Sequence, residues 1–225
     1  MPGRTIPLVT DEIYHVFNRG VARQLTYRNR RDYLRFIELM NYYVNVDVTP
    51  RYSKFIMLPF LERTQILSDL AKKKNFLVEI ISFCLMPNHF HMIIKQTREG
   101  GVTQFLQNVA NSYVRYFDTK YHREGPLYQG RFKSIHIESD EQLLHVVRYV
   151  HLNPYTSYIV KDLEKLLLYQ YSSLPVFLNT QTNPFISLQQ IRSYFKRVDD
   201  FKQFTLDQGD YQRKLSDIRH VCLDI

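Results

Sequence analysis

Two adjacent runs of strand-forming residues constrain the fold of this chain most. Residues 76–85 (FLVEIISFCL) and 89–96 (HFHMIIKQ) are rich in β-branched and aromatic side chains. Only the turn-like segment MPN separates them. Strands joined by so short a turn pair as an antiparallel hairpin. The chain is therefore expected to contain an antiparallel sheet.

The segments on both sides of this hairpin are expected to extend the sheet and cover it. Each was assigned from the period of its apolar residues, which is close to two in strands and 3.6 in helices. In the helix after the hairpin, Tyr113 and Phe117 fall on the apolar stripe and are assigned to the core. The expected flanking elements are a strand at 13–20, a helix at 28–46, a helix at 102–121, a strand at 128–139 and a helix at 139–154.

The resulting order is βαββαβ followed by a helix. This order predicts the α+β class, with a ferredoxin-like split βαβ arrangement in which an antiparallel sheet packs against helices. We expect one domain at 1–160 and a helical C-terminal extension at 161–225. Inside the domain, residues 47–75 contain two prolines and a helical run, and they are interpreted as a helical insertion.

The composition restricts the location and the partners. Cys84 and Cys222 are the only cysteines, which fits neither a disulfide framework nor a cysteine zinc site, and the chain has no membrane-spanning apolar run. A cytoplasmic protein with no membrane partner is expected. The formal net charge of +8 favours a polyanion, with nucleic acid preferred over an acidic membrane surface or no partner.

A pair of histidines stands in the second strand of the hairpin. Residues two apart on a strand point to the same face, about 6.6 to 6.8 Å apart along the chain, so His89 and His91 project together. Two such imidazoles can converge on one metal ion. The pair alone fits two half-exposed histidines on a sheet surface better, and a third ligand would reverse that preference.

The helix at 139–154 offers that third ligand. Tyr149 and Asn153 are neighbours at i, i+4 on its polar flank, beside His145. The amide oxygen of asparagine is an acceptable ligand for a divalent ion, and the tyrosine hydroxyl lies one turn away. In the alternative interpretation, the tyrosine lies at the core boundary and the asparagine is a C-terminal cap before Pro154. The residues alone leave both open.

The same helix has marked boundaries. Ser139 and Gln142 have the spacing of a capping box at its start. Pro154 is expected to stop it.

Several spaced motifs resemble one family. YHVFNRGV, CLMPNHFHMII, YVRYF followed by REGPLYQGRFKS, RYVHLNP and YSS occur in the order found in single-tyrosine HUH transposases. The set is most similar to the REP-associated tyrosine transposases and extends over residues 13–173. The resemblance implies a HUH endonuclease fold, a divalent metal on His89 and His91, a catalytic Tyr149 and an Asn153 that completes the metal site.

The identity of the nucleophilic tyrosine and that of the metal ion each have alternatives. Tyr113 and Tyr116 compete as nucleophiles, but at i+4 they have Phe117 and Lys120 rather than a metal-ligand residue. Imidazoles favour zinc-like ions, whereas the resemblance implies Mg²⁺ or Mn²⁺, and Mn²⁺ suits both.

Cationic and amide residues interleaved with Tyr121, Tyr128 and Phe132 predict a DNA-binding surface, in which rings stack on bases. The other histidines, at positions 15, 122, 136 and 220, are interpreted as packing or surface residues, and Cys84 as a core residue. The predicted DNA-binding residues are Asn18, Arg19, Arg115, Lys120, Arg123, Gln129, Arg131 and Lys133.

Together these features predict a metal-dependent endonuclease and strand transferase for single-stranded or hairpin DNA. It would act through a 5′-phosphotyrosine intermediate. Two alternative functions are a hairpin-binding protein that does not cut DNA and a metal phosphodiesterase that uses water as the nucleophile. The sequence leaves a homodimer open.

Overall fold

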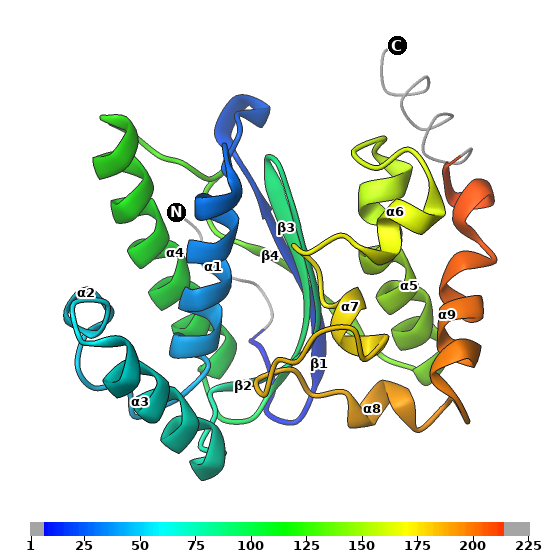
Figure 1. Cartoon of the computed structure of the whole chain (residues 1–225), viewed down its shortest axis with the longest axis horizontal. Helices are drawn as coiled ribbons and strands as arrows, with labels where there is room; N and C mark the ends of the chain where they lie inside the picture. Colours follow the sequence, from blue (N-terminus) through cyan, green and yellow to red (C-terminus); the bar gives the residue numbers. More distant parts are fainter. Residues whose placement is uncertain (1–6, 214–225) are drawn as a thin grey trace.

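A four-stranded antiparallel sheet forms the centre of the protein. In the computed structural model, which describes residues 7–213, its strands lie in the order β2-β3-β1-β4 (Figure 1). This is the strand order of the split βαβ arrangement. The predicted fold class is confirmed. The strands are β1 (Ile13–Arg19), β2 (Val78–Met86), β3 (His89–Gln96) and β4 (Lys133–Ile137).

Helices cover both faces of this sheet. Helices α1 and α4 lie on one face, and α5 lies on the other with α6, α7 and α9 around it (Figure 1). The short helix α2 and the longer α3 fall within the segment expected to be a helical insertion. The helical elements are α1 (Arg30–Tyr43), α2 (Tyr52–Phe55), α3 (Phe60–Lys73), α4 (Gly101–Tyr121), α5 (Asp140–Thr156), α6 (Leu163–Leu167), α7 (Leu174–Phe177), α8 (Gln189–Arg192), α9 (Val198–Leu206) and the 3-10 turn η1 (Val21–Arg23).

Alternation along β3 divides its side chains between the two helical layers. The ring of Phe90 contacts Phe36 of α1, with the ring centroids 5.4 Å apart. Tyr113 and Phe117 of α4 are fully buried in the same layer, as expected from the apolar stripe. Because neighbouring strand residues point to opposite faces, His89 and His91 are directed toward α5.

The start of α5 follows the expectation only in part. The side chain of Ser139 accepts a hydrogen bond from the Gln142 backbone N–H at 3.2 Å, so the cap is present. The Gln142 side chain, however, accepts from the Glu138 N–H at 2.8 Å instead of completing a capping box with Ser139.

The expected stop at Pro154 is wrong, because α5 continues to Thr156 with Pro154 inside its last turn. Residues after the proline satisfy carbonyl groups at the end of α5. The N–H of Ser157 donates to the carbonyl of Asn153 at 3.0 Å, and the N–H of Ile159 donates to the carbonyl of Pro154 at 2.9 Å. Asn153 is thus a buried residue inside the helix, which removes the C-terminal cap interpretation.

The segment after α6 runs along the outer edge of β2. The N–H of Leu85 donates to the Tyr171 carbonyl at 2.8 Å, and the N–H of Ser173 donates to the Phe83 carbonyl at 2.9 Å. Helices α8 and α9 follow, where polar helices were expected, and α9 packs on α5. The boundary between residues 160 and 161 stays a prediction.

Two of the residues interpreted from the sequence, Cys222 and His220, lie outside the described residues. Across positions 7–213, no helix has both the length and the apolar character that a bilayer crossing requires.

Candidate active site

Five side chains from β1 and β3 share the sheet face beneath α5. In the antiparallel register, Phe17 stands opposite His91, and Arg19 stands opposite His89. His15 is two residues before Phe17 and therefore points to the same face. The imidazole rings of His89 and His91 are 5.0 Å apart between centroids. The sheet thus brings the two histidines together, as predicted.

Both histidines use Nδ1 for contacts within the protein. Nδ1 of His91 lies 2.9 Å from Nε2 of His15, and Nδ1 of His89 lies 2.6 Å from the side-chain oxygen of Asn88. The described residues offer no hydrogen-bond partner to Nε2 of either ring. Histidines that bind metals usually have this arrangement, in which a protein acceptor orients one nitrogen and the other is left for the ion.

The electrostatic environment keeps these rings neutral at pH 7. Burial lowers the pKa of His89 to about 4, with a further contribution from the charge of Arg19. Burial also lowers the pKa of His91 well below its usual value, and that of His15 to about 4. A neutral imidazole has the free lone pair that metal coordination requires.

Tyr149 extends from α5 over the histidines. Its ring meets His91 edge-on with the centroids 5.5 Å apart, and it meets His15 at 6.2 Å. The side chain is 39% exposed, so a substrate can reach it. No described residue forms a hydrogen bond with its hydroxyl.

The two competing tyrosines occupy the other face of the sheet. Tyr113 is fully buried in α4 and its hydroxyl donates to the carbonyl of Thr26 at 2.5 Å. The hydroxyl of Tyr116 donates to the Asp32 carboxylate at 2.9 Å. Neither contacts the histidine face.

Asn153 lies one helical turn after Tyr149 and is buried. Its amide group donates to the Tyr149 carbonyl at 3.1 Å, while no described residue donates to its side-chain oxygen. No hydrogen bond between described residues joins Asn153 to either histidine. Within the described residues there is also no cluster of three or more His, Cys, Asp or Glu that could hold a metal ion.

Part of the predicted DNA-binding set lies at the end of β1 next to the histidines. The Asn18 amide donates to the Gly130 carbonyl at 3.1 Å, and the Gln129 N–H donates to the Arg19 carbonyl at 2.8 Å. Lys133 pairs with β1 opposite Phe17 and shares the histidine face. Arg19, Arg131 and Lys133 are exposed.

The remaining predicted residues belong to α4 and its end, in the opposite layer. Arg115 is exposed there. The ammonium of Lys120 lies 2.6 Å from Asp32, and the guanidinium of Arg123 lies 2.8 Å from Asp118. The fold therefore does not bring these three cations to the histidine face.

Of the rings expected to stack on bases, two have other contacts. Tyr128 is buried and meets Phe90 edge-on. The Tyr121 hydroxyl donates to Asp32 at 2.8 Å, and the Arg28 guanidinium lies over its ring. The idea that Tyr128 stacks on a base is wrong, because its ring is enclosed by the core.

Sequence reasoning missed His15 and Asn88. His15 was interpreted as a packing or surface residue, but it is hydrogen-bonded to His91 inside the site. The signal was available: with β1 next to β3, an odd-numbered residue of β1 shares the face of the histidines. His122 and His136 are exposed and Cys84 is buried, as the sequence predicted.

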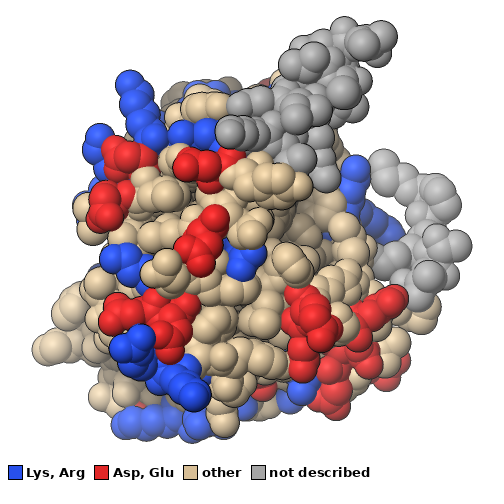
Figure 2. Space-filling view, turned by 90° about the vertical axis from the view of Figure 1, so that its right-hand side faces the viewer, with Lys and Arg blue, Asp and Glu red and all other residues tan. Residues whose placement is uncertain are grey.

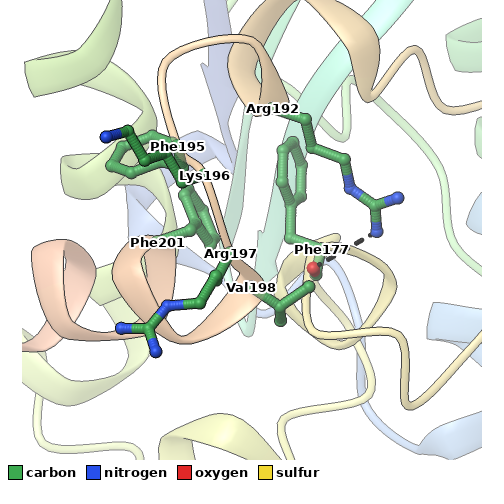
Figure 3. A pocket seen from close by; sticks show the side chains of 7 residues that line it. All are labelled: Phe177, Arg192, Phe195, Lys196, Arg197, Val198 and Phe201. Atoms are coloured by element: carbon green, nitrogen blue, oxygen red, sulfur yellow. Dashed lines mark hydrogen bonds between the residues drawn. The ribbon is translucent and has the colours of Figure 1, made fainter.

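A small pocket lies elsewhere, in the C-terminal extension. It is bordered by Phe177 of α7, Arg192 of α8, and Phe195 and Phe201 around the start of α9 (Figure 3). None of the predicted site residues lines it. The candidate site lies instead on the sheet face beside Tyr149.

Residues 43–153 match the model of the family described as "Transposase IS200 like". Over this segment the chain is similar to the IS200-like transposase family. The matched range includes His89, His91 and Tyr149 and ends at Asn153. It confirms the family resemblance indicated by the motifs, although it begins after β1 and therefore does not include His15.

Other comparisons add little to this assignment. No curated protein matches the chain. Among the solved structures that match is a REP-associated tyrosine transposase bound to a REP hairpin, with 14% identity and a TM-score of 0.49, covering 83% of this chain and 92% of that one.

Proposed function

We propose that this protein is a metal-dependent endonuclease and strand transferase for single-stranded, hairpin-associated DNA. The observation that carries the proposal is the edge contact between the Tyr149 ring and His91, whose Nε2 is left without a described partner. The ring of the exposed Tyr149 thus lies against one of a pair of neutral imidazoles. Phosphoryl transfer to tyrosine needs such a nucleophile close to a site for positive charge.

The donor atoms fit a divalent ion. His89 and His91 would hold it through Nε2, and Asn153 would supply its amide oxygen. Mg²⁺ and Mn²⁺ are the candidates, and Mn²⁺ suits a mixed nitrogen and oxygen set better. When bound, such an ion supplies positive charge to a nonbridging phosphate oxygen.

The chemistry at the protein side belongs to Tyr149. Its hydroxyl oxygen attacks the phosphorus, so that a tyrosine O–P bond forms and the bond to the 3′ oxygen breaks. The Tyr149 hydroxyl gives up its proton and the leaving 3′ oxygen takes one up, so that the products are a free 3′-OH and a 5′-phosphotyrosine. Because the phosphodiester energy is retained in the adduct, another 3′-OH can attack it and join a strand without ATP.

Charge on the surface supports DNA at the β1 end of the sheet. Arg19, Arg131 and Lys133 are exposed near or beside the histidines and can contact phosphates. The face formed by the C-terminal extension carries both acidic and basic side chains (Figure 2), and one hollow in this region is lined by Asp199 and Asp207 together with Arg148 and Arg197.

Two other functions make different predictions. A hairpin-binding protein without nuclease activity would bind DNA and leave it intact. A metal phosphodiesterase that uses water would cut DNA and stay active in Tyr149→Phe. Both are tested by the experiment that tests the proposal.

The test uses labelled, hairpin-containing single strands incubated with the protein and Mn²⁺, followed by denaturing electrophoresis. We expect a shortened strand and a slower, protease-sensitive band that carries the label on protein. Matched single strands without a hairpin test the substrate preference. Binding without any cut product would contradict the proposal, as would cleavage without a protein-linked band.

A further inference from the structure

The helix that carries Tyr149 also carries a buried histidine with no role in the proposed chemistry. His151 is two residues further along α5 and is fully buried. Residues two apart on a helix are separated by about 200° around its axis. Tyr149 therefore faces the sheet histidines, whereas His151 faces the C-terminal extension.

His151 is hydrogen-bonded to the segment that borders β2. Its Nε2 lies 2.8 Å from the hydroxyl oxygen of Ser173. That hydroxyl also accepts the N–H of Phe83 at 2.9 Å and can donate to the Phe83 carbonyl at 3.3 Å. A hydroxyl has one donor and two acceptor sites, so when Ser173 donates to the Phe83 carbonyl, Nε2 of His151 is the donor.

Ser173 thereby connects α5 to the strand beside the candidate metal site. Phe83 directly precedes Cys84, and Cys84 stands opposite His91 in the β2–β3 register. Two successive hydrogen bonds thus join the helix of Tyr149 to the sheet at the level of His91. This connection fixes how far α5 is shifted and rotated relative to the histidines.

Aromatic packing holds the His151 ring in one orientation. The ring meets Phe177 of α7 at 5.3 Å and Phe201 of α9 at 6.0 Å between centroids. The two phenylalanines stack on each other at 4.9 Å, and both appear beside the pocket in Figure 3. A ring enclosed in this way can donate in only one direction, toward Ser173.

We propose that His151 and Ser173 are positioning residues, whose hydrogen bond sets the Tyr149 hydroxyl in reach of a phosphate held at His89 and His91. The proposal rests on the function proposed above for Tyr149. It assigns a task to the C-terminal extension, which is to fix the nucleophile helix on the sheet. A misplacement of about 1 Å can reduce a rate on the order of 100-fold.

Three variants test this role. His151→Phe keeps a ring between Phe177 and Phe201 but removes the donor. His151→Gln places an amide N–H near the position of Nε2 and restores it. Ser173→Ala removes the hydroxyl from the other side of the bond.

The measurements are the single-turnover rate of adduct formation with saturating oligonucleotide and Mn²⁺, the Kd for the oligonucleotide, and the Tm. We expect His151→Phe and Ser173→Ala to slow the adduct step by up to about 100-fold, with little change in Kd. His151→Gln should recover most of the rate.

Tyr155→Phe is the matched control on the same helix. It removes a hydrogen bond from the Tyr155 hydroxyl to Asp210, which joins α5 to a part of the extension that has no hydrogen bond to Phe83. We expect it to lower the Tm without slowing the adduct step.

Three results would overturn the positioning role. They are an unchanged rate in His151→Phe, a rate that falls only in proportion to the folded fraction, and a failure of His151→Gln to recover. If the wild-type protein forms no adduct, the proposed function fails by itself. A crystal structure of His151→Phe then decides the inference, since Tyr149 displaced from His91 supports it and Tyr149 in place overturns it.

Discussion

Two groups of polar side chains, one in each helical layer of the sheet, differ in their hydrogen bonding. In the α1/α4 layer, polar side chains satisfy one another around the buried carboxylate of Asp32. In the α5 layer, Nε2 of His89, Nε2 of His91 and the Tyr149 hydroxyl have no hydrogen-bond partner among the described residues. A fully hydrogen-bonded polar network indicates a structural role, whereas polar atoms on one face that lack partners indicate a candidate ligand site.

The Asp32 carboxylate accepts hydrogen bonds from several donors at once. These donors are the ammonium of Lys120, the hydroxyls of Tyr116 and Tyr121, and the N–H of Arg28. Burial acts to raise the pKa of Asp32, but the hydrogen bonds from these donors outweigh it and lower the pKa. The network joins the start of α1 to the end of α4.

The largest effect is expected from replacing the two histidines of the candidate site. His89→Ala and His91→Ala should each abolish cleavage and leave DNA affinity within several-fold, because phosphate contacts from Lys and Arg supply most of the affinity. Cleavage gels and binding titrations on the same preparations check this. If affinity fell in parallel with cleavage, the histidines would be structural residues like those of the other layer.

The closed network should matter for stability alone. Asp32→Asn should reduce the free energy of unfolding by about 3 kcal/mol, the lower end of the range for a broken buried pair, since Lys120 is partly exposed. Denaturant unfolding measures the loss. The adduct rate per folded molecule should stay at the wild-type value, and a loss of rate at unchanged stability would contradict the division of roles.

The pH dependence of stability gives the sign of the Asp32 contribution. A carboxyl with a lowered pKa in the folded state stabilises the protein above its unfolded pKa of about 3.9, and this contribution disappears as the pH falls through the folded value. The stability difference between wild type and Asp32→Asn should therefore shrink as the pH falls below about 4. A difference that grows in acid would contradict the assigned shift.

A smaller effect is expected at the open site from Asn153. Asn153→Ala should weaken Mn²⁺ binding on the order of 10- to 100-fold and leave activity partly recoverable at high Mn²⁺. Activity measured against Mn²⁺ concentration separates this from a loss of the nucleophile. Thr156→Val removes a hydrogen bond in the same turn without removing a candidate ligand and should keep the wild-type requirement. Equal requirements in both variants would exclude Asn153 as a ligand.

The smallest effect distinguishes an exposed cation from a paired one. Arg131→Ala should reduce the slope of log K against log salt by about one unit, as one lost phosphate contact requires. Arg123 is already paired with Asp118, and Arg123→Ala should change the slope less. Identical slopes for the two variants would show that pairing does not decide which cations contact DNA.

The sequence predicted the elements whose signals are local. The hairpin follows from two strand-like runs around MPN, and α4 follows from an apolar stripe that includes Tyr113 and Phe117. Their order was sufficient for the split βαβ class. The assignment of residues 89–96 to a strand was sufficient to place His89 and His91 on one face, because side chains alternate along any strand.

Features that depend on distant partners were missed or assigned wrongly. His15 meets His91 across 76 residues, and Lys120 meets Asp32 across 88, so neither pairing has a local signal. Pro154 stays inside α5 because hydrogen bonds from residues after it and burial of its turn outweigh the local preference to stop. Local patterns predicted the candidate site, whereas tertiary contacts decide which residues pack around it.

The most direct test of the central claim is to locate the covalent adduct. After reaction with an oligonucleotide and Mn²⁺, a tryptic digest is analysed by mass spectrometry for a peptide that carries a nucleotide. The account predicts the adduct on Tyr149, and its complete loss in Tyr149→Phe with folding and DNA binding retained. An adduct on Tyr113, Tyr116 or Tyr128, or cleavage that persists in Tyr149→Phe without any adduct, would contradict it.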